Sequence, residues 1–244
     1  MAEDTYDIHF YWDPVCPFAW MTSRWVEKVA AQKDHRVDYR FISLRLLNAG
    51  VDYAEQFPPE YEQMHTAGLR MLRVAAKVRA EYGRDVVGDL YTALGTAIWD
   101  VDPPESQEAF AAGLGGVDHV GGALERVGLP RDLATALDDD AWDETIAAET
   151  EEALALTGRD VGTPIIQFRP PDGLAFFGPV ISRMPSDAEA VELWDHVVGL
   201  AGFAGFAEMK RSLRELPQLR ALGVSEAEVG VTEDWHGGSR RLKR

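Results

Sequence analysis

The order of its predicted strands and helices limits what this chain can fold into more than any other feature of the sequence. Alternating apolar side chains predict strands over residues 6–12 and 37–44, and helical spacing predicts a helix over residues 17–33 between them. A strand–helix–strand unit favours two parallel strands joined by a right-handed crossover. From about residue 53 to residue 157 the apolar positions follow helical spacing, without a convincing strand.

Strands are predicted again towards the end of the chain. Residues 165–168 (IIQF) and 174–177 (LAFF) flank an Asp-Gly turn that is typical of a β-hairpin. A capping box that begins at Ser186 predicts a helix that ends at Leu200, and a shorter helix is predicted over residues 203–213. The order β-α-β, helices, β-β-α predicts an α/β fold with a mixed central sheet and an all-helical insertion between its two halves.

This order divides the chain into four parts. Residues 1–50 form the predicted βαβ part, and residues 51–158 form the helical insertion, which we expect to act as a lid. Residues 159–215 form the ββα part. Residues 216–244 follow it, and because the sequence becomes polar and loses its periodicity from Gly223 onward, we expect a flexible tail.

Charge and composition exclude several classes of protein. The formal net charge of −17 argues against nucleic acid or anionic lipid as a partner, because both require a basic surface. The sequence has no apolar run of about 18 residues, the length of a membrane-spanning helix, and its acidic start MAEDTYD is unlike a secretory signal. A single cysteine cannot form an internal disulfide, so a cytoplasmic location is the simplest expectation.

The single cysteine, Cys16, lies in DPVCPFAW, where the first predicted strand gives way to a helix. This position places its sulfur near the unpaired N–H groups and the positive dipole end of the helix, which stabilise an anion. Pro17 fits the first helical turn, where a missing N–H costs nothing. The sequence therefore predicts an activated thiol with a depressed pKa; the alternative is a buried cysteine that serves as a small apolar side chain.

A second feature lies far along the chain, in VGTPIIQF. Pro164 directly precedes a predicted strand, a position at which strands tolerate proline. A cis bond between Thr163 and Pro164 would leave the backbone of Thr163 free to pair with an extended ligand. The residues alone do not establish a cis bond, because few X-Pro bonds in folded proteins are cis.

Together these stretches resemble a known family. FYWDPVCPFAW, followed at long range by DVGTPIIQF and LAFFGPV, is similar to the DsbA-like branch of the thioredoxin superfamily, and most closely to its mycothiol-dependent nitroreductase and reductase group. The resemblance covers roughly residues 5–215 and includes CPFAW with MTSRWV, and SLRLLN. It implies a thioredoxin-like fold, a cis Thr163–Pro164 bond that faces Cys16, and a low-molecular-weight thiol, mycothiol or glutathione, as cofactor.

The chain departs from the family pattern at Ala19. The family's redox motif is C-P-x-C, and an alanine at its fourth position cannot resolve a mixed disulfide from within the site. One remaining chemistry is a mixed disulfide on Cys16 that an external thiol resolves. In the other, the protein activates the sulfur of a bound thiol. Kappa-class glutathione transferases and 2-hydroxychromene-2-carboxylate isomerases share the architecture and use a serine at the cysteine position.

Several residues are expected to surround the thiol. Phe18 and Trp20 are candidates for an apolar wall against an aromatic substrate, with core packing as the alternative for Trp20. Asn48, expected at the end of the second strand, is a candidate polar ligand contact, and Tyr61 lies where a lid would be. The expected thiol- or substrate-binding residues are Pro17, Phe18, Ala19, Trp20, Asn48, Tyr61, Gly162, Thr163 and Pro164.

The sequence thus predicts an enzyme, a monothiol oxidoreductase in which Cys16 is the catalytic nucleophile. Its expected partners are a small-molecule thiol and a small electrophilic, nitroaromatic or disulfide substrate, and a homodimer is left open. Asp13 is expected to cap the turn that follows it, and the six histidines show no metal-ligand spacing, so no metal is expected. Two alternatives remain: a thiol transferase or isomerase of the kappa-like kind, and a non-catalytic binding protein with a thioredoxin fold.

Overall fold

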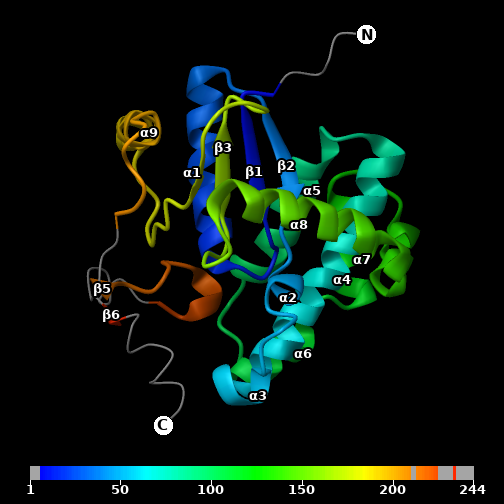
Figure 1. Ribbon diagram of the computed structural model, residues 1–244. Coiled ribbons are helices and arrows are strands. Elements are labelled where there is room, and N and C mark those ends of the chain that lie inside the picture. Colours follow the sequence, from blue (N-terminus) through cyan, green and yellow to red (C-terminus); the bar gives the residue numbers. More distant parts are fainter. Residues whose placement is uncertain (1–5, 210–212, 225–232, 235–244) are drawn as a thin grey trace.

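A computed structural model describes residues 6–209, 213–224 and 233–234. Its central sheet has four strands in the order β2-β1-β3-β4, and these are β1 (Ile8–Trp12), β2 (Val37–Phe41), β3 (Ile165–Phe168) and β4 (Ala175–Phe177) (Figure 1). The strands β1 and β2 are parallel, whereas β3 is antiparallel to β1 and β4 is antiparallel to β3. The two halves of the chain therefore meet at the β1–β3 pair, in the middle of the sheet.

Helices cover both faces of this sheet. On one face α1 (Pro17–Lys33) packs with α9 (Asp187–Ala201), and α8 (Asp143–Thr157) crosses the other face (Figure 1). The side chains of β1 alternate between the two layers, as predicted: Phe10 and Trp12 enter the large core, whereas Tyr11 joins a small cluster with Ala153 of α8. This mixed sheet between helical layers confirms the predicted thioredoxin-like α/β fold.

The first half of the chain follows the sequence prediction closely until the end of β2. The helix α1 has the predicted bounds, and it ends where Asp34 adopts the left-handed conformation. The strand β2 ends at Phe41, earlier than expected, because Ser43 caps a short helix, α2 (Leu44–Leu47), with its side chain. Asn48 therefore terminates a helix and not a strand, so the predicted position of Asn48 is wrong.

Between residues 51 and 158 every regular element is a helix, as predicted, and loops such as residues 100–106 connect them. Gly83 ends the longest helix, with a φ of 93° that a residue with a Cβ rarely adopts. The elements are α3 (Tyr53–Gln56), α4 (Pro59–Tyr82), α5 (Val86–Trp99), α6 (Gln107–Gly113), α7 (Val117–Arg126), η1 (Arg131–Asp138), η2 (Asp140–Trp142) and α8.

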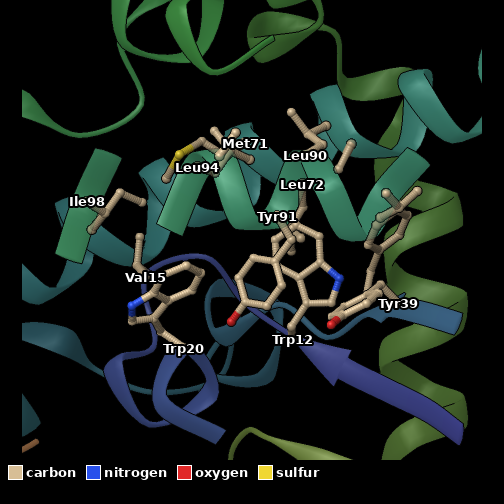
Figure 2. Close-up of a cluster of buried hydrophobic side chains, with 14 of the residues drawn as sticks. Trp12, Val15, Trp20, Tyr39, Met71, Leu72, Leu90, Tyr91, Leu94 and Ile98 are labelled. Carbon is tan, nitrogen blue, oxygen red and sulfur yellow. The ribbon is translucent and has the colours of Figure 1, made fainter. Parts of the chain in front are cut away.

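The insertion and the sheet share one hydrophobic core. Figure 2 shows Tyr91 of α5 lying between Trp12 of β1 and Trp20 of α1. The rings of Tyr91 and Trp12 are stacked with centroids 4.0 Å apart, and the ring of Trp20 meets Tyr91 edge-on at 5.7 Å. Such aromatic pairs contribute beyond the area that they bury. The helices next to the thiol are thus packed as part of the same body as the sheet.

The end of the chain differs from the prediction. Residues 203–209 contain turns and no helix, and Leu213 lies in a short strand, β5 (Leu213–Arg214), which pairs with β6 (Glu233–Asp234); residues 210–212 lie outside the described part. Leu219 and Ala221 are buried, the latter in a 3-10 turn, η3 (Arg220–Leu222). Residues 216–223 therefore belong to the folded part and not to a flexible tail.

Candidate active site around Cys16

Cys16 occupies the N-cap position of α1, directly after β1. Its backbone is extended, and its sulfur accepts a hydrogen bond from the N–H of Ala19 at 3.4 Å. Pro17 follows at the first helical position, as the sequence predicts. The strand-to-helix turn therefore places the sulfur at the N-terminal end of α1.

The Thr163–Pro164 peptide bond is cis and lies opposite this thiol. The Cys16 thiol donates a hydrogen bond to the carbonyl oxygen of Thr163 at 3.4 Å, although 147 residues separate the two. The Thr163 hydroxyl donates to the Tyr11 carbonyl at 3.1 Å and holds this loop against β1. The expectation that a cis Thr-Pro bond faces Cys16 is confirmed.

The Cys16 side chain is buried, with 7% of its surface exposed. Burial raises the pKa of the thiol to about 12, and the N–H groups of Ala19 and Phe18 counteract that rise while the carboxyl of Asp13 adds to it. A low-polarity environment disfavours the thiolate, and here it outweighs the helix start. The prediction of a depressed pKa is therefore wrong for this resting arrangement, in which the sulfur is a neutral, hydrogen-bonded thiol.

The two aromatic residues beside the thiol differ in exposure. Phe18 is half-buried and remains available at the surface of the site. Trp20 is only 2% exposed; its ring packs on Tyr91, and the guanidinium of Arg24 lies 4.1 Å from the ring centroid. The core alternative for Trp20 is therefore correct, and burial separates its ring from any ligand that approaches the surface.

Asn48 and Tyr61 are placed differently with respect to the sulfur. The side-chain amide of Asn48 donates to the Leu44 carbonyl at 2.8 Å and so completes the end of α2. Tyr61, in the first turn of α4, is half-buried; burial and then the adjacent Cys16 raise the pKa of its hydroxyl. Tyr61 thus lies near enough to Cys16 for the thiol to affect its pKa, whereas the amide of Asn48 already has a partner within its own helix.

Tyr61 belongs to an aromatic cluster that the sequence analysis did not identify. Its ring stacks on Phe57 at 5.6 Å and lies 5.7 Å from His65, and the Tyr53 hydroxyl pairs with Nδ1 of His65 at 2.9 Å. Burial, followed by the charge of Arg45, lowers the pKa of His65 to about 4, so the imidazole is neutral. The signal in the sequence was the four-residue spacing of these rings, which continues from α3 into the first turns of α4.

A second unexpected neighbour is Phe177 of β4. A Cβ added to Gly162 would lie 3.9 Å from its ring, and Phe177 is 37% exposed beside the cis-proline loop. The N–H of Gly178 donates to the Pro164 carbonyl at 2.8 Å and fixes β4 to that loop. Gly162, Thr163 and Pro164 therefore lie together on the far wall of the site, with Phe177 as its aromatic edge.

The model of the family described as Rv2466c-like, mycothiol-dependent nitroreductase Rv2466c, matches residues 15–211. The chain belongs to this Rv2466c-like family. The matched segment begins one residue before Cys16 and extends past the Thr163–Pro164 bond, so it contains both walls of the site. Membership makes the chain a thiol-dependent oxidoreductase and confirms the resemblance to mycothiol-dependent nitroreductases drawn from the sequence.

Other known proteins are similar to this member of the Rv2466c-like family. The uncharacterized protein Rv2286c of Mycobacterium tuberculosis is 30% identical over 207 residues, which cover 85% of this chain and 81% of that one. The cytosolic disulfide reductase DsbM from Pseudomonas aeruginosa has 13% identity and a TM-score of 0.49, covering 80% of this chain and 99% of that chain. The disulfide bond oxidoreductase DsbG from M. tuberculosis has 14% identity and a TM-score of 0.44, covering 76% and 82%.

Within the described residues, no three side chains among histidine, cysteine, aspartate and glutamate gather closely enough to hold a metal ion. No helix in the same part of the chain is long and apolar enough to span a bilayer.

Proposed function

We propose that this protein is a monothiol oxidoreductase of the Rv2466c-like family, in which Cys16 reacts and an external low-molecular-weight thiol, mycothiol, completes the turnover. The observation that carries the proposal is the 3.4 Å contact between the Cys16 sulfur and the Thr163 carbonyl. The sulfur faces a backbone oxygen across the site, and Ala19 stands where a second thiol would resolve the intermediate. Resolution must therefore come from a thiol in solution.

With a disulfide substrate, the sulfur of Cys16 attacks one substrate sulfur. A new S–S bond joins Cys16 to that half of the substrate, and the other half leaves as a thiol with the proton. A mycothiol thiolate then attacks the half bound to Cys16, which restores the cysteine and releases a substrate–mycothiol disulfide. The electrons come from the external thiol, so the oxidation state of Cys16 is unchanged over the cycle.

With a nitroaromatic substrate, the electrons come from two thiols, and the mixed disulfide joins Cys16 to mycothiol. Cys16 and one mycothiol together supply two electrons and two protons, which reduce the nitro group to a nitroso group and water and leave Cys16 joined to mycothiol. A second mycothiol displaces Cys16 and departs as the mycothiol disulfide. Both routes pass through a Cys16 disulfide, the intermediate that the experiment below detects.

The proposed ligand surface combines the residues that lie around the exposed side of the thiol. Pro17, Phe18 and the Ala19 N–H form one wall, and Gly162, Thr163 and Pro164 form the other. Tyr61 covers the top of the site, and Asn48 contributes only if its amide leaves the Leu44 carbonyl. In the resting thiol the Thr163 carbonyl is occupied by Cys16, so an entering ligand that pairs with Thr163 also frees the sulfur.

A cytoplasmic setting with abundant small thiols suits this chemistry, and we propose it for this chain. The division at residues 51 and 158 is proposed as the boundary of the helical insertion within the thioredoxin-like fold. The homodimer that the sequence leaves open is a separate question, which gel filtration would answer.

The experiment is intact-mass analysis after incubation with oxidised mycothiol or oxidised glutathione. We expect one adduct on Cys16, formed preferentially with mycothiol, and none on the Cys16→Ser variant. The Ala19→Cys variant is the matched test, because it restores a second thiol at the resolving position; its adduct should be replaced by an internal disulfide two mass units lighter than the dithiol. Absence of any adduct on the unmodified protein would refute the monothiol mechanism.

One observation favours a second candidate, a thiol transferase or isomerase. The neutral, buried state of Cys16 suits a group that orients the sulfur of a bound cofactor and does not itself react. In that case Cys16→Ser would retain turnover with mycothiol and an electrophile, since a serine hydroxyl keeps both the donor and the acceptor functions of the thiol. Loss of turnover in Cys16→Ser would exclude this candidate.

A further inference from the structure

Asp13 is a fully buried carboxyl three residues before the thiol. Its Oδ1 accepts the Val15 N–H at 3.0 Å, inside the turn that carries Cys16. Its Oδ2 accepts the Leu44 N–H at 2.8 Å, at the first residue of α2. One side chain therefore ties the cysteine turn to the end of the parallel strand β2.

The helix α4 closes the third side of this carboxyl. A Cβ added to Gly68 would lie 2.6 Å from Oδ1 of Asp13 and 2.9 Å from a methyl group of Val15. Both distances are far below normal contact, so only glycine fits where α4 crosses the turn. The same helix carries Tyr61 two turns earlier. The Asp13 carboxyl is thus enclosed by backbone from three elements that surround Cys16.

No lysine, arginine or histidine forms an ion pair with Asp13 among the described residues. The titratable groups that face it are Cys16 itself, Tyr53 of α3 and Tyr91 of α5, all neutral at physiological pH. Arg45 lies beyond the ring of Tyr53, at 5.1 Å, and pairs with Glu62.

On α4, His65 and Tyr61 face Tyr53 and the thiol, and both are neutral because burial lowers the pKa of the first and raises that of the second. Burial also raises the pKa of Asp13 to about 7, which the N–H groups of Leu44 and Val15 partly counteract. Asp13 is therefore the group around the thiol whose charge changes near neutral pH.

We propose that Asp13 is a positioning residue of the thiol site: its carboxyl fastens the Cys16 turn to α2 beneath α4, and its negative charge adds to burial in disfavouring the thiolate. The proposal rests on the proposed function, because it concerns the reactivity of the sulfur that forms the mixed disulfide. A like charge close to a forming thiolate disfavours that thiolate. Protonation of Asp13 removes this repulsion, so a larger fraction of Cys16 is thiolate and the sulfur reacts faster as a nucleophile.

The two groups should consequently titrate as a coupled pair. Below pH 7 the carboxyl is neutral and the thiolate fraction rises tenfold per pH unit. As the pH passes the pKa of Asp13, each carboxyl that ionises makes its neighbouring thiol harder to ionise. For a coupling of one pKa unit, the slope of the logarithm of the thiolate fraction falls to about one half, a partial levelling, before it returns to one. This levelling is a signature that a purely structural role for Asp13 does not produce.

The test is alkylation of the wild-type protein by iodoacetamide between pH 5 and pH 10, followed by intact mass. The thiolate displaces iodide, an S–C bond replaces the C–I bond, and because Cys16 is the single cysteine the mass change reports it alone. We expect the slope of the logarithm of the rate against pH to fall from one to about one half just above pH 7 and then to recover. A slope of one through the whole interval would overturn the proposal, and this measurement needs no variant.

The Asp13→Asn variant sharpens the test. Without the charge, we expect alkylation at pH 8 to be about tenfold faster, equivalent to one pKa unit of the thiol, and the levelling to disappear. Ser43→Ala is the matched control, since it removes the cap that accepts the Leu46 N–H at 3.4 Å and loosens the same helix start without a change of charge. Equal behaviour of the two variants, with both folded by circular dichroism, would show a structural role only and overturn the proposal.

The readout separates this proposal from the proposed function. Alkylation requires neither mycothiol nor substrate, so the coupled titration can be present in a protein that forms no mycothiol adduct. Conversely, an adduct on Cys16 together with an uncoupled titration would support the oxidoreductase and overturn the role of Asp13.

Discussion

Among the buried carboxylates of the described residues, Asp13 and Glu149 have contrasting surroundings. Glu149 of α8 lies between Arg40 of β2 at 3.1 Å and Arg79 of α4 at 2.8 Å, and it also accepts the Phe41 N–H at 2.9 Å. Asp13, beside the thiol, has only backbone N–H partners. Both side chains are at most 6% exposed.

This difference distinguishes Glu149, a carboxylate that stabilises the fold, from Asp13, a carboxyl beside the reactive thiol. Burying a charge is costly unless it is paired, and Glu149 has two cations while joining α8, α4 and β2. Asp13 lacks a cation although its environment is equally dry. Asp13 is an unpaired, buried carboxyl in the same turn as the cysteine, so its charge can act on the thiol. Such departures from stable packing concentrate at functional sites.

Removal of the paired carboxylate should have the largest effect. Glu149→Ala leaves the largely buried Arg79 without its carboxylate and Arg40 with Glu152 alone, and we expect the free energy of unfolding to fall by about 3–5 kcal/mol in urea titrations. The comparison predicts that Glu149→Ala lowers the stability of the protein without changing the reactivity of Cys16. The rate of Cys16 alkylation in the folded protein should remain within about twofold of the wild type.

Glu151→Ala is the control on the same helix. Its carboxylate is 57% exposed and binds the exposed Arg159, so its loss should cost about 1 kcal/mol or less. If Glu149→Ala were no more destabilising than Glu151→Ala, the interpretation of Glu149 as the charge that fastens α8 to the sheet would be wrong.

The contrast between these carboxylates also shows what the sequence could predict. The bounds of α1 followed from local signals, a capping position and Pro17. The end of β2 was misplaced because the alternating pattern continues into residues that Ser43 caps as a helix. The helix predicted over residues 203–213 is absent from residues 203–209, where Gly205 interrupts the apolar spacing.

The errors at the site have a different origin. The position of Cys16 at a helix start and the facing Thr163 were foreseen, the first from local pattern and the second from the family resemblance. The pKa of the thiol was not, because it depends on burial beneath α4 and on the neighbouring Asp13. Such burial is set by segments far apart in the sequence, and a one-dimensional pattern carries no measure of it.

A smaller effect is expected where α4 meets Asp13. Gly68→Ala places a methyl group 2.6 Å from the Asp13 carboxyl, so either the helix or the turn must shift, and we expect a loss of about 1–3 kcal/mol in unfolding free energy. Because the shift acts on the Cys16 turn, the alkylation rate should change as well, unlike in Glu149→Ala. This pair of variants tests directly whether the two buried carboxylates serve different purposes.

Gly122→Ala in α7 is the matched control for that substitution. Nothing lies within 4 Å of a Cβ at this position, so the alanine should be neutral or stabilise the helix by up to about 1 kcal/mol. An equal response of Gly68 and Gly122 to alanine would contradict the close packing of α4 on Asp13.

The smallest effect is expected at a third buried carboxylate, which is intermediate between the other two. Glu215 accepts the Ser182 hydroxyl at 2.6 Å and pairs with Arg183, whose own side chain is 55% exposed. Because water already solvates that guanidinium, Arg183→Ala should lower the free energy of unfolding far less than Glu149→Ala does. The measurement is urea unfolding beside Arg220→Ala, whose pair with Asp102 is exposed on both sides and should contribute less still. A loss as large as that of Glu149→Ala would mean that exposure of the cation does not set the strength of these pairs, and the graded comparison of the three carboxylates would fail.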